Sequence, residues 1–108
     1  MAILPINKNL IGDIYIMKVS NLINNIGNTV KNQFVMEDRN NITFQSYDHI
    51  ICKINKKSRK ITFDKHFLNY SVTTSKHVNN FFSNEGVRFT IQDIRKENSL
   101  VTFRNLNK

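Results

Sequence analysis

Hydroxyl, basic and aromatic side chains gather in one short stretch, "YSVTTSKHVNNFF", which spans residues 70–82. Its apolar residues follow the i, i+3, i+4 spacing of a helix face: Val78, Phe81 and Phe82. Thr73 or Thr74 is expected as the N-cap, because a hydroxyl there accepts a hydrogen bond from a free backbone N–H. Gly86 is the expected stop signal. The stretch therefore predicts a short amphipathic helix.

This helix would carry cations at the end where a helix prefers anions. Its N-terminus has free N–H groups and partial positive charge, so Lys76 and His77 in the first turn would face an unfavourable field. One interpretation is that the misfit is tolerated. The other is that an external phosphate or carboxylate completes the site. The candidate anion-binding residues are Thr74, Ser75, Lys76 and His77.

A second basic cluster lies in "KINKKSRK", residues 53–60, between two runs of alternating apolar residues. Its cations are Lys53, Lys56, Lys57, Arg59 and Lys60. On a hairpin turn they are placed to contact phosphates, and each contact would release condensed counterions. The alternative is a solvated turn whose charges keep a strand edge from pairing with other chains. The sequence leaves both interpretations open.

Residues that alternate with the expected core positions extend this basic surface. Those expected on the outer side of their strands are Lys60, Thr62, Arg88, Thr90, Thr102 and Arg104. The phenylalanines expected on the inner side are Phe44, Phe63, Phe89 and Phe103. Domains that read single strands stack bases on exposed rings, which this pattern does not offer. The outer face is therefore predicted to contact backbone phosphates, or an acidic patch of a protein.

The residue types that carry most enzyme chemistry show no catalytic spacing. Cys52 shares an alternating face with Ile50 and Ile54, so we expect a buried thiol that resists ionisation. His49 and Cys52 would point to opposite faces of a strand, and no spacing typical of metal ligands occurs. The acidic residues are scattered, and the glycine-rich and GxSxG motifs are missing. We expect a protein that is not an enzyme and holds no metal or cofactor.

Period-two alternation predicts antiparallel hairpins through most of the chain. The first two expected hairpins are "QFVMEDRNNITFQ", residues 33–45, and the pair "HIICKIN" and "KITFD", residues 49–64. A third is expected where "GVRFTIQDI" and "SLVTFRN", residues 86–105, meet across the polar turn "RKENS". These patterns favour a sheet built largely from neighbouring strands.

The start of the chain predicts one more strand and one more helix. The run "DIYIMKV", residues 13–19, reads as a strand. Ser20 is then placed to cap an Asn-rich helix whose apolar residues are Leu22, Ile23, Ile26 and Val30. Together the elements predict an α+β domain, with an antiparallel sheet of about five to seven strands and one or two helices packed on one face.

The composition is that of one globular domain covering residues 1–108, with 40% hydrophobic residues and a net charge of +8. This charge favours nucleic acid or another polyanion as a partner, although abundant Asn, Ile and Lys are also typical of AT-rich genomes. No apolar run approaches the roughly 20 residues of a membrane span, and no signal peptide is recognisable. We expect a cytoplasmic protein that does not bind membranes.

The middle of the chain resembles a group of small, largely uncharacterised proteins of phages and mobile elements in Gram-positive bacteria. The resemblance covers residues 44–82, with an FxSY strand in "FQSYDHIICKIN" and a YSxTTSKxxxxFL helix in "YSVTTSKHVNNFF". Phe82 stands where that pattern has Leu. The residues that carry the match are Phe44, Ser46, Tyr47, Tyr70, Ser71, Thr73, Thr74, Ser75, Lys76 and Phe81.

The resemblance implies a setting rather than a reaction. Small phage proteins of this kind often bind host defence complexes, such as CRISPR–Cas effectors. We therefore expect a binding protein that inhibits or modulates a host nucleoprotein in the bacterial cytoplasm. The alternative is an accessory protein of phage replication or transcription that binds the nucleic-acid backbone directly.

Overall fold

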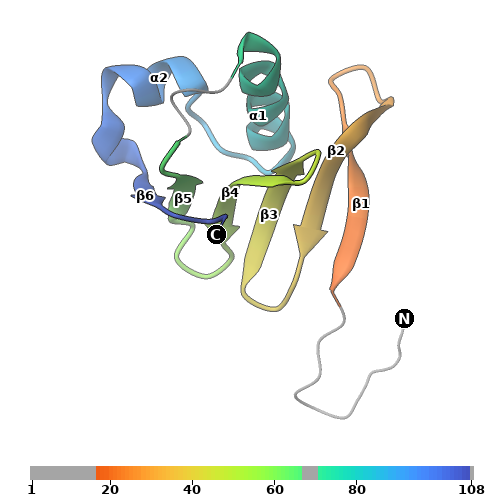
Figure 1. The fold of residues 1–108 in the computed structure, drawn as a ribbon, viewed down its shortest axis with the longest axis horizontal. Helices are drawn as coiled ribbons and strands as arrows, with labels where there is room; N and C mark the ends of the chain where they lie inside the picture. The colour runs from red at the N-terminus through yellow and green to blue at the C-terminus, as the bar shows by residue number, and fades with distance from the viewer. Residues whose placement is uncertain (1–16, 67–70, 108) are drawn as a thin grey trace.

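The computed structural model describes residues 17–66 and 71–107 and shows a sheet with helices on one face (Figure 1). In chain order the elements are β1 (Lys18–Ile23), β2 (Thr29–Glu37), β3 (Asn41–Ser46), β4 (His49–Asn55), β5 (Ile61–Asp64), α1 (Val72–Asn84), α2 (Ile91–Lys96), the short 3-10 helix η2 (Asn98–Leu100) and β6 (Thr102–Arg104).

The six strands lie in the sheet in their sequence order, β1 to β6. Each of the first four strands pairs with the next in an antiparallel hairpin, whereas β6 pairs with β5 in parallel after α1, α2 and η2. Figure 1 shows α1 beside the β1–β2 hairpin and α2 toward the end of the sheet formed by β5 and β6. The expected α+β class and mainly antiparallel sheet are confirmed.

The hydrophobic core lies between the sheet and the two α-helices. One inward row crosses four strands in register, with Phe44 opposite Cys52, Cys52 opposite Phe63, and Phe63 opposite Phe103. From the helix, Phe81 stacks on Phe44 with ring centroids 5.4 Å apart. Burying a phenylalanine stabilises a fold by roughly 1.5–3 kcal/mol, so this aromatic layer is a main source of stability.

The residues that alternate with this row face away from the helices. Thr43 lies opposite Lys53, Lys53 opposite Thr62, and Thr62 opposite Thr102. This outward row is rich in hydroxyl groups and has a single cation, Lys53, at its centre. The predicted alternation of core and surface residues therefore holds for β3 and for most of β4 and β5. The expected inward place of Ile50 is wrong, because the register shifts after Phe44 and Ile51 is buried in its stead.

The expected Asn-rich helix after Ser20 is wrong, because residues 18–37 form the β1–β2 hairpin. The Asn24 side chain shapes its turn by accepting hydrogen bonds from the N–H groups of Ile26 and Asn28, at 3.1 and 3.0 Å. Gly27 completes the turn with a φ of 87°, which is easy only for glycine. The apolar spacing imitated a helix, but asparagine and glycine favour the turn. Of the expected strand at 13–19, residues 13–16 lie outside the described residues, and β1 begins at Lys18.

The expected third hairpin is also wrong, because residues 91–96 form α2 and β6 pairs with β5 instead. Thr90 is the N-cap of α2, and its hydroxyl accepts a hydrogen bond from the Asp93 N–H. The Asp93 carboxylate in turn accepts one from the Thr90 N–H at 2.9 Å, which completes a capping box. Phe89 still packs against the core, as expected, but from a segment with no strand.

Candidate functional site

Helix α1 begins two or three residues earlier than the sequence predicted. Ser71 is the N-cap, and its Oγ accepts a hydrogen bond from the Thr74 N–H at 3.1 Å. The first turn therefore covers residues 72–75, and Lys76 and His77 belong to the second turn. Since the dipole field falls off beyond the first turn, the predicted electrostatic misfit is largely removed. The expected cap at Thr73 or Thr74 is wrong by two or three positions, whereas the stop at Gly86 is confirmed by its φ of 77°.

The hydroxyl groups expected to bind an anion have partners within the fold. The Thr74 Oγ1 lies 3.1 Å from the Ser71 Oγ. Ser75 is buried, donates from its hydroxyl to the Ser71 carbonyl at 3.2 Å, and accepts from the Arg95 guanidinium at 3.1 Å. Ser75 thus links α1 to α2, and its hydroxyl serves packing of the two helices.

Lys76 and His77 instead line a hollow of about 340 Å³ between α1 and the β1–β2 turn. The other residues around it are Asn24, Asn25, Val30 and Asn80. Burial, and then the neighbouring Lys76 ammonium, hold the pKa of His77 below its usual value. His77 is therefore mainly uncharged at neutral pH, and Lys76 is the cation of this hollow.

The basic hairpin turn between β4 and β5 is shaped by Asn55. Its side-chain oxygen accepts hydrogen bonds from the N–H groups of Lys57 and Ser58, at 3.0 and 2.9 Å. Arg59 follows with a φ of 63°, and its N–H donates to the Asn55 carbonyl at 2.8 Å. This local network fixes the directions in which the basic side chains leave the turn.

Two of the five predicted cations of the hairpin are used to hold the fold together. The Lys56 ammonium lies 2.6 Å from the Glu37 carboxylate at the end of β2. The Arg59 guanidinium donates to the Glu85 carbonyl, just after α1, at 2.6 Å. Burial, and then the Glu37 carboxylate, raise the pKa of Glu85 against the opposite effect of Arg59 and Lys56. These contacts tie the turn to β2 and to the C-terminal end of α1.

The other three cations, Lys53, Lys57 and Lys60, remain at the surface. Lys57 and Lys60 are exposed, and no carboxylate of the described residues lies within ion-pair distance of either ammonium. Lys53 is half-buried in the outward row of the sheet. We call these three residues the lysine triad; it is the part of the predicted basic cluster that stays available for an external anion.

The predicted outer face is only partly assembled. Thr62 and Thr102 lie side by side in the parallel β5–β6 pair, as expected. Arg104 is exposed in β6, and its guanidinium donates to the Phe103 carbonyl at 3.0 Å. Arg88 and Thr90, by contrast, lie outside the sheet on the connection from α1 to α2. Their expected place on a strand was wrong for the same reason as the third hairpin.

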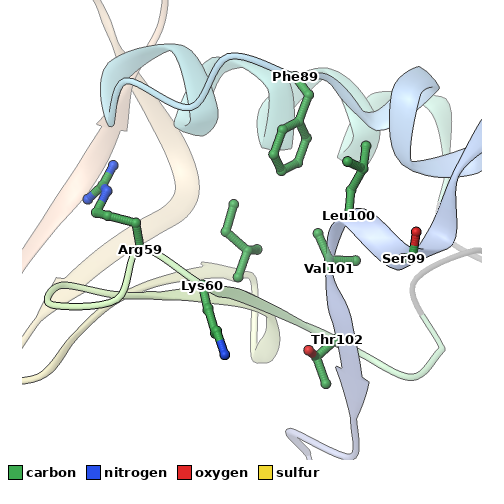
Figure 2. A pocket seen from close by; sticks show the side chains of 8 residues that line it. Arg59, Lys60, Phe89, Ser99, Leu100, Val101 and Thr102 are labelled. Carbon is green, nitrogen blue, oxygen red and sulfur yellow. The ribbon is translucent and has the colours of Figure 1, made fainter.

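A groove that the sequence did not predict lies next to the lysine triad. It has a volume of about 430 Å³ and runs between the start of β5 and the η2–β6 segment. The residues that line it are Arg59, Lys60, Ile61, Phe89, Ser99, Leu100, Val101 and Thr102. Figure 2 shows Phe89 reaching down from the α1–α2 connection toward the segment that carries Leu100 and Val101. No sequence motif marks this groove, because its walls come from three separate segments.

Cys52 lies in the core with no exposed surface, as its alternation predicted. Burial raises the pKa of its thiol, so the reactive thiolate is disfavoured. Within residues 17–66 and 71–107, no group of three His, Cys, Asp or Glu side chains is arranged to hold a metal ion. The Asp64 carboxylate is buried and accepts a hydrogen bond from the Leu106 N–H at 3.1 Å, with the His49 imidazole 3.9 Å away.

Among the described residues, neither α-helix has the length and apolar character needed to cross a bilayer.

Comparison with known proteins identifies a family but no characterised relative. No curated protein and no solved structure matches the chain. The model of a family of unknown function, DUF8033, matches residues 17–97, which include every element from β1 to α2. The chain therefore belongs to the DUF8033 family.

Proposed function

We propose that the protein is a non-catalytic binding protein of a phage or mobile element, which attaches to a host defence nucleoprotein such as a CRISPR–Cas effector and inhibits or modulates it. The contact would be made by the lysine triad with an anionic surface of that complex. The observation that supports this most directly is that most described carboxylates have partners within the protein, whereas two exposed lysines of the triad do not. The resemblance of residues 44–82 to phage and mobile-element proteins supports the setting.

Most of the described carboxylates have partners within the protein. Those engaged in hydrogen bonds or ion pairs are Glu37, Asp38, Asp64, Asp93 and Glu97. Lys57 and Lys60 have no such partner among the described residues, and they project from the same turn. With a net charge of +8 on the chain, these two exposed lysines are placed to attract and steer polyanions.

Phosphate contact fits this surface better than reading of bases. Phe44 and Phe63 have no exposed surface, and Phe89 and Phe103 pack against the core. Lysine ammonium groups bind phosphates as point charges and carry little sequence information. A guide RNA or bound DNA within a nucleoprotein would present such phosphates. Direct binding of free nucleic acid, without a protein component, is the second candidate on the same observation.

The test compares a purified effector, with and without its guide RNA, against free duplex DNA and RNA. We expect the protein to bind the guide-loaded effector and to lower its target cleavage. Free nucleic acid should bind more weakly, with an affinity that falls steeply as salt rises. Equal binding to free nucleic acid and to the effector would support the second candidate instead. Failure to bind either would refute the proposed function.

The lysine triad is tested with a matched control. The variant Lys53→Ser/Lys57→Ser/Lys60→Ser should weaken binding by at least about tenfold at low salt and lower the salt slope by about 0.9 per lysine on duplex DNA. The control Lys31→Ser/Lys65→Ser/Lys96→Ser removes the same charge from exposed positions outside the triad. Equal losses in the two variants would mean that net charge alone attracts the partner.

A further inference from the structure

We propose that the groove between β5 and the η2–β6 segment receives an apolar side chain from an acidic peptide segment of a protein partner. This inference rests on the proposed function in one respect, namely that the partner is a nucleoprotein with a protein surface. It names the segment of that protein surface that the groove would bind.

Half of the residues that line the groove are apolar, and half are polar or basic. Ile61 and Val101 are 5% and 9% exposed and form its base. Leu100 is 40% exposed and presents its side chain beside them. Phe89 is held in place by an edge-on contact with Phe82, at 5.7 Å between ring centroids. Ile61, Val101 and Phe89 are thus held by the core while Leu100 is exposed, and a pocket of this size can take one or two apolar side chains.

The rim of the groove is basic and hydroxylic. Arg59 and Lys60 lie on the β5 side and Ser99 and Thr102 on the η2–β6 side, with the Lys60 and Thr102 side chains directed away from Phe89 (Figure 2). No residue that lines the groove is acidic. The Glu97 carboxylate nearby accepts a hydrogen bond from the Ser99 hydroxyl at 3.3 Å. This charge distribution complements a ligand that carries carboxylates around an apolar centre.

A peptide fits these walls better than a nucleobase. Bases stack on the flat face of an aromatic ring, whereas three of the four apolar groups here are aliphatic, from Ile61, Leu100 and Val101. The only ring, that of Phe89, already packs on Phe82. An aliphatic or aromatic side chain, by contrast, gains from burial against any of these groups. Flanking carboxylates would then be attracted by the charge of Lys60 at the edge of β5, and by that of Arg59, whose guanidinium also donates to the Glu85 carbonyl.

The experiment uses the full chain and three fluorescein-labelled peptides, measured by fluorescence polarisation. The first has a central Leu–Phe pair flanked by Asp and Glu, the second replaces that pair with Ala–Ala, and the third flanks Leu–Phe with Lys. We expect saturable binding of the first peptide, with an affinity at least about tenfold above that of the other two. Equal binding of the first two peptides would exclude an apolar anchor, and no binding of the first would overturn the proposal.

Two variants locate the binding site. Leu100→Asp should weaken binding of the first peptide by at least about tenfold, whereas Ile26→Asp, at a residue 76% exposed in the β1–β2 turn, should leave it unchanged. Lys60→Glu should also weaken binding, with Lys31→Glu as its control. Melting curves check that each variant is folded, and Lys60→Glu tests the site even where Leu100→Asp lowers stability. Unchanged binding by both groove variants would overturn the proposal.

A labelled oligothymidine separates the two classes of ligand. If it binds and Leu100→Asp abolishes that binding, the groove is a site for single-stranded nucleic acid and the peptide proposal is wrong. Peptide binding together with no effector binding would refute the proposed function and keep the groove as a peptide site. Effector binding that survives Leu100→Asp, with no peptide binding, would refute the groove and leave the proposed function standing.

Discussion

The start of α1 and the turn between β4 and β5 both carry basic residues beside hydrogen-bonding groups, yet the fold uses them differently. At the helix start, Ser71, Thr74 and Ser75 bond to each other or to Arg95. At the hairpin turn, Asn55 satisfies the backbone, so Lys57 and Lys60 are left to face solvent. The difference shows that a basic segment leaves its cations open to solvent only where the fold does not use them.

The largest effect is expected when the exposed lysines of the hairpin turn are reversed in charge and binding to the purified guide-loaded effector is measured. Lys57→Glu/Lys60→Glu should weaken binding by well over about tenfold at low salt, because each change removes an attraction and adds a repulsion. The matched reversal Lys31→Glu/Lys76→Glu has the same net charge and should bind nearly as well as the unmodified protein. Equal losses, measured by titration at two salt concentrations, would break the distinction between the two regions.

The next effect separates the two kinds of cation within the hairpin itself. Arg59→Ala should lower the free energy of unfolding by about 1–1.5 kcal/mol, since it removes a charged donor to the Glu85 carbonyl at an exposed site. Lys57→Ala should change it by less than about 0.5 kcal/mol. Urea denaturation measures both variants.

Arg59→Gly serves as a control for backbone strain. Because Arg59 has a φ of 63°, glycine would recover about 1 kcal/mol relative to alanine at this position. A similar stability for Arg59→Ala and Lys57→Ala would mean that the Arg59 contact contributes nothing and that both cations are free.

A smaller effect on stability is expected at the N-cap of α1, Ser71. Ser71→Ala should lower the free energy of unfolding by about 1 kcal/mol, because the Thr74 N–H loses its acceptor. Thr73→Ala, at the position predicted from sequence, should be nearly neutral and serves as the control. If Thr73→Ala were the more destabilising of the two, the helix would begin later than the structure shows.

The sequence predicts most of the sheet and of α1 because their patterns depend on local alternation. Phe44, Cys52, Ile54, Phe63 and the α1 stripe are all buried as their spacing indicates. The two failures occur where apolar spacing competes with turn or cap chemistry. The asparagines around Gly27 and the T-x-x-D signature of Thr90 and Asp93 were the signals that would have identified the hairpin and α2.

The candidate site was predictable only as a set of charged residues. Which cations are available depends on groups far away in sequence, since Lys56 pairs with Glu37 and Arg59 with the Glu85 carbonyl. The groove depends on three segments, two of which lie within residues 86–105, the wrongly predicted hairpin. Local pattern therefore located the basic turn, but only tertiary contacts could divide it into structural and available cations.

The smallest expected effect concerns Lys76. In the second turn of α1 it lies beyond the strongest part of the helix dipole, so Lys76→Glu should change the free energy of unfolding by less than about 0.3 kcal/mol. The Lys76→Glu substitution should also change the pKa of His77, which is lowered by burial and then by the Lys76 charge. Replacing the ammonium with a carboxylate should raise that pKa, while burial continues to lower it.

This shift has a defined consequence for pH dependence. A histidine whose pKa is lower in the folded than in the unfolded state binds fewer protons when folded, so the protein loses stability as pH falls below the usual histidine range. Lys76→Glu should reduce that loss, because the folded pKa moves back toward the unfolded value. Proton NMR titration of the His77 ring and melting temperatures from pH 7 down to about pH 5 measure the two quantities. A large loss of effector binding in Lys76→Glu, with the His77 pKa unchanged, would instead indicate that Lys76 faces an external anion and that the helix start is a binding site after all.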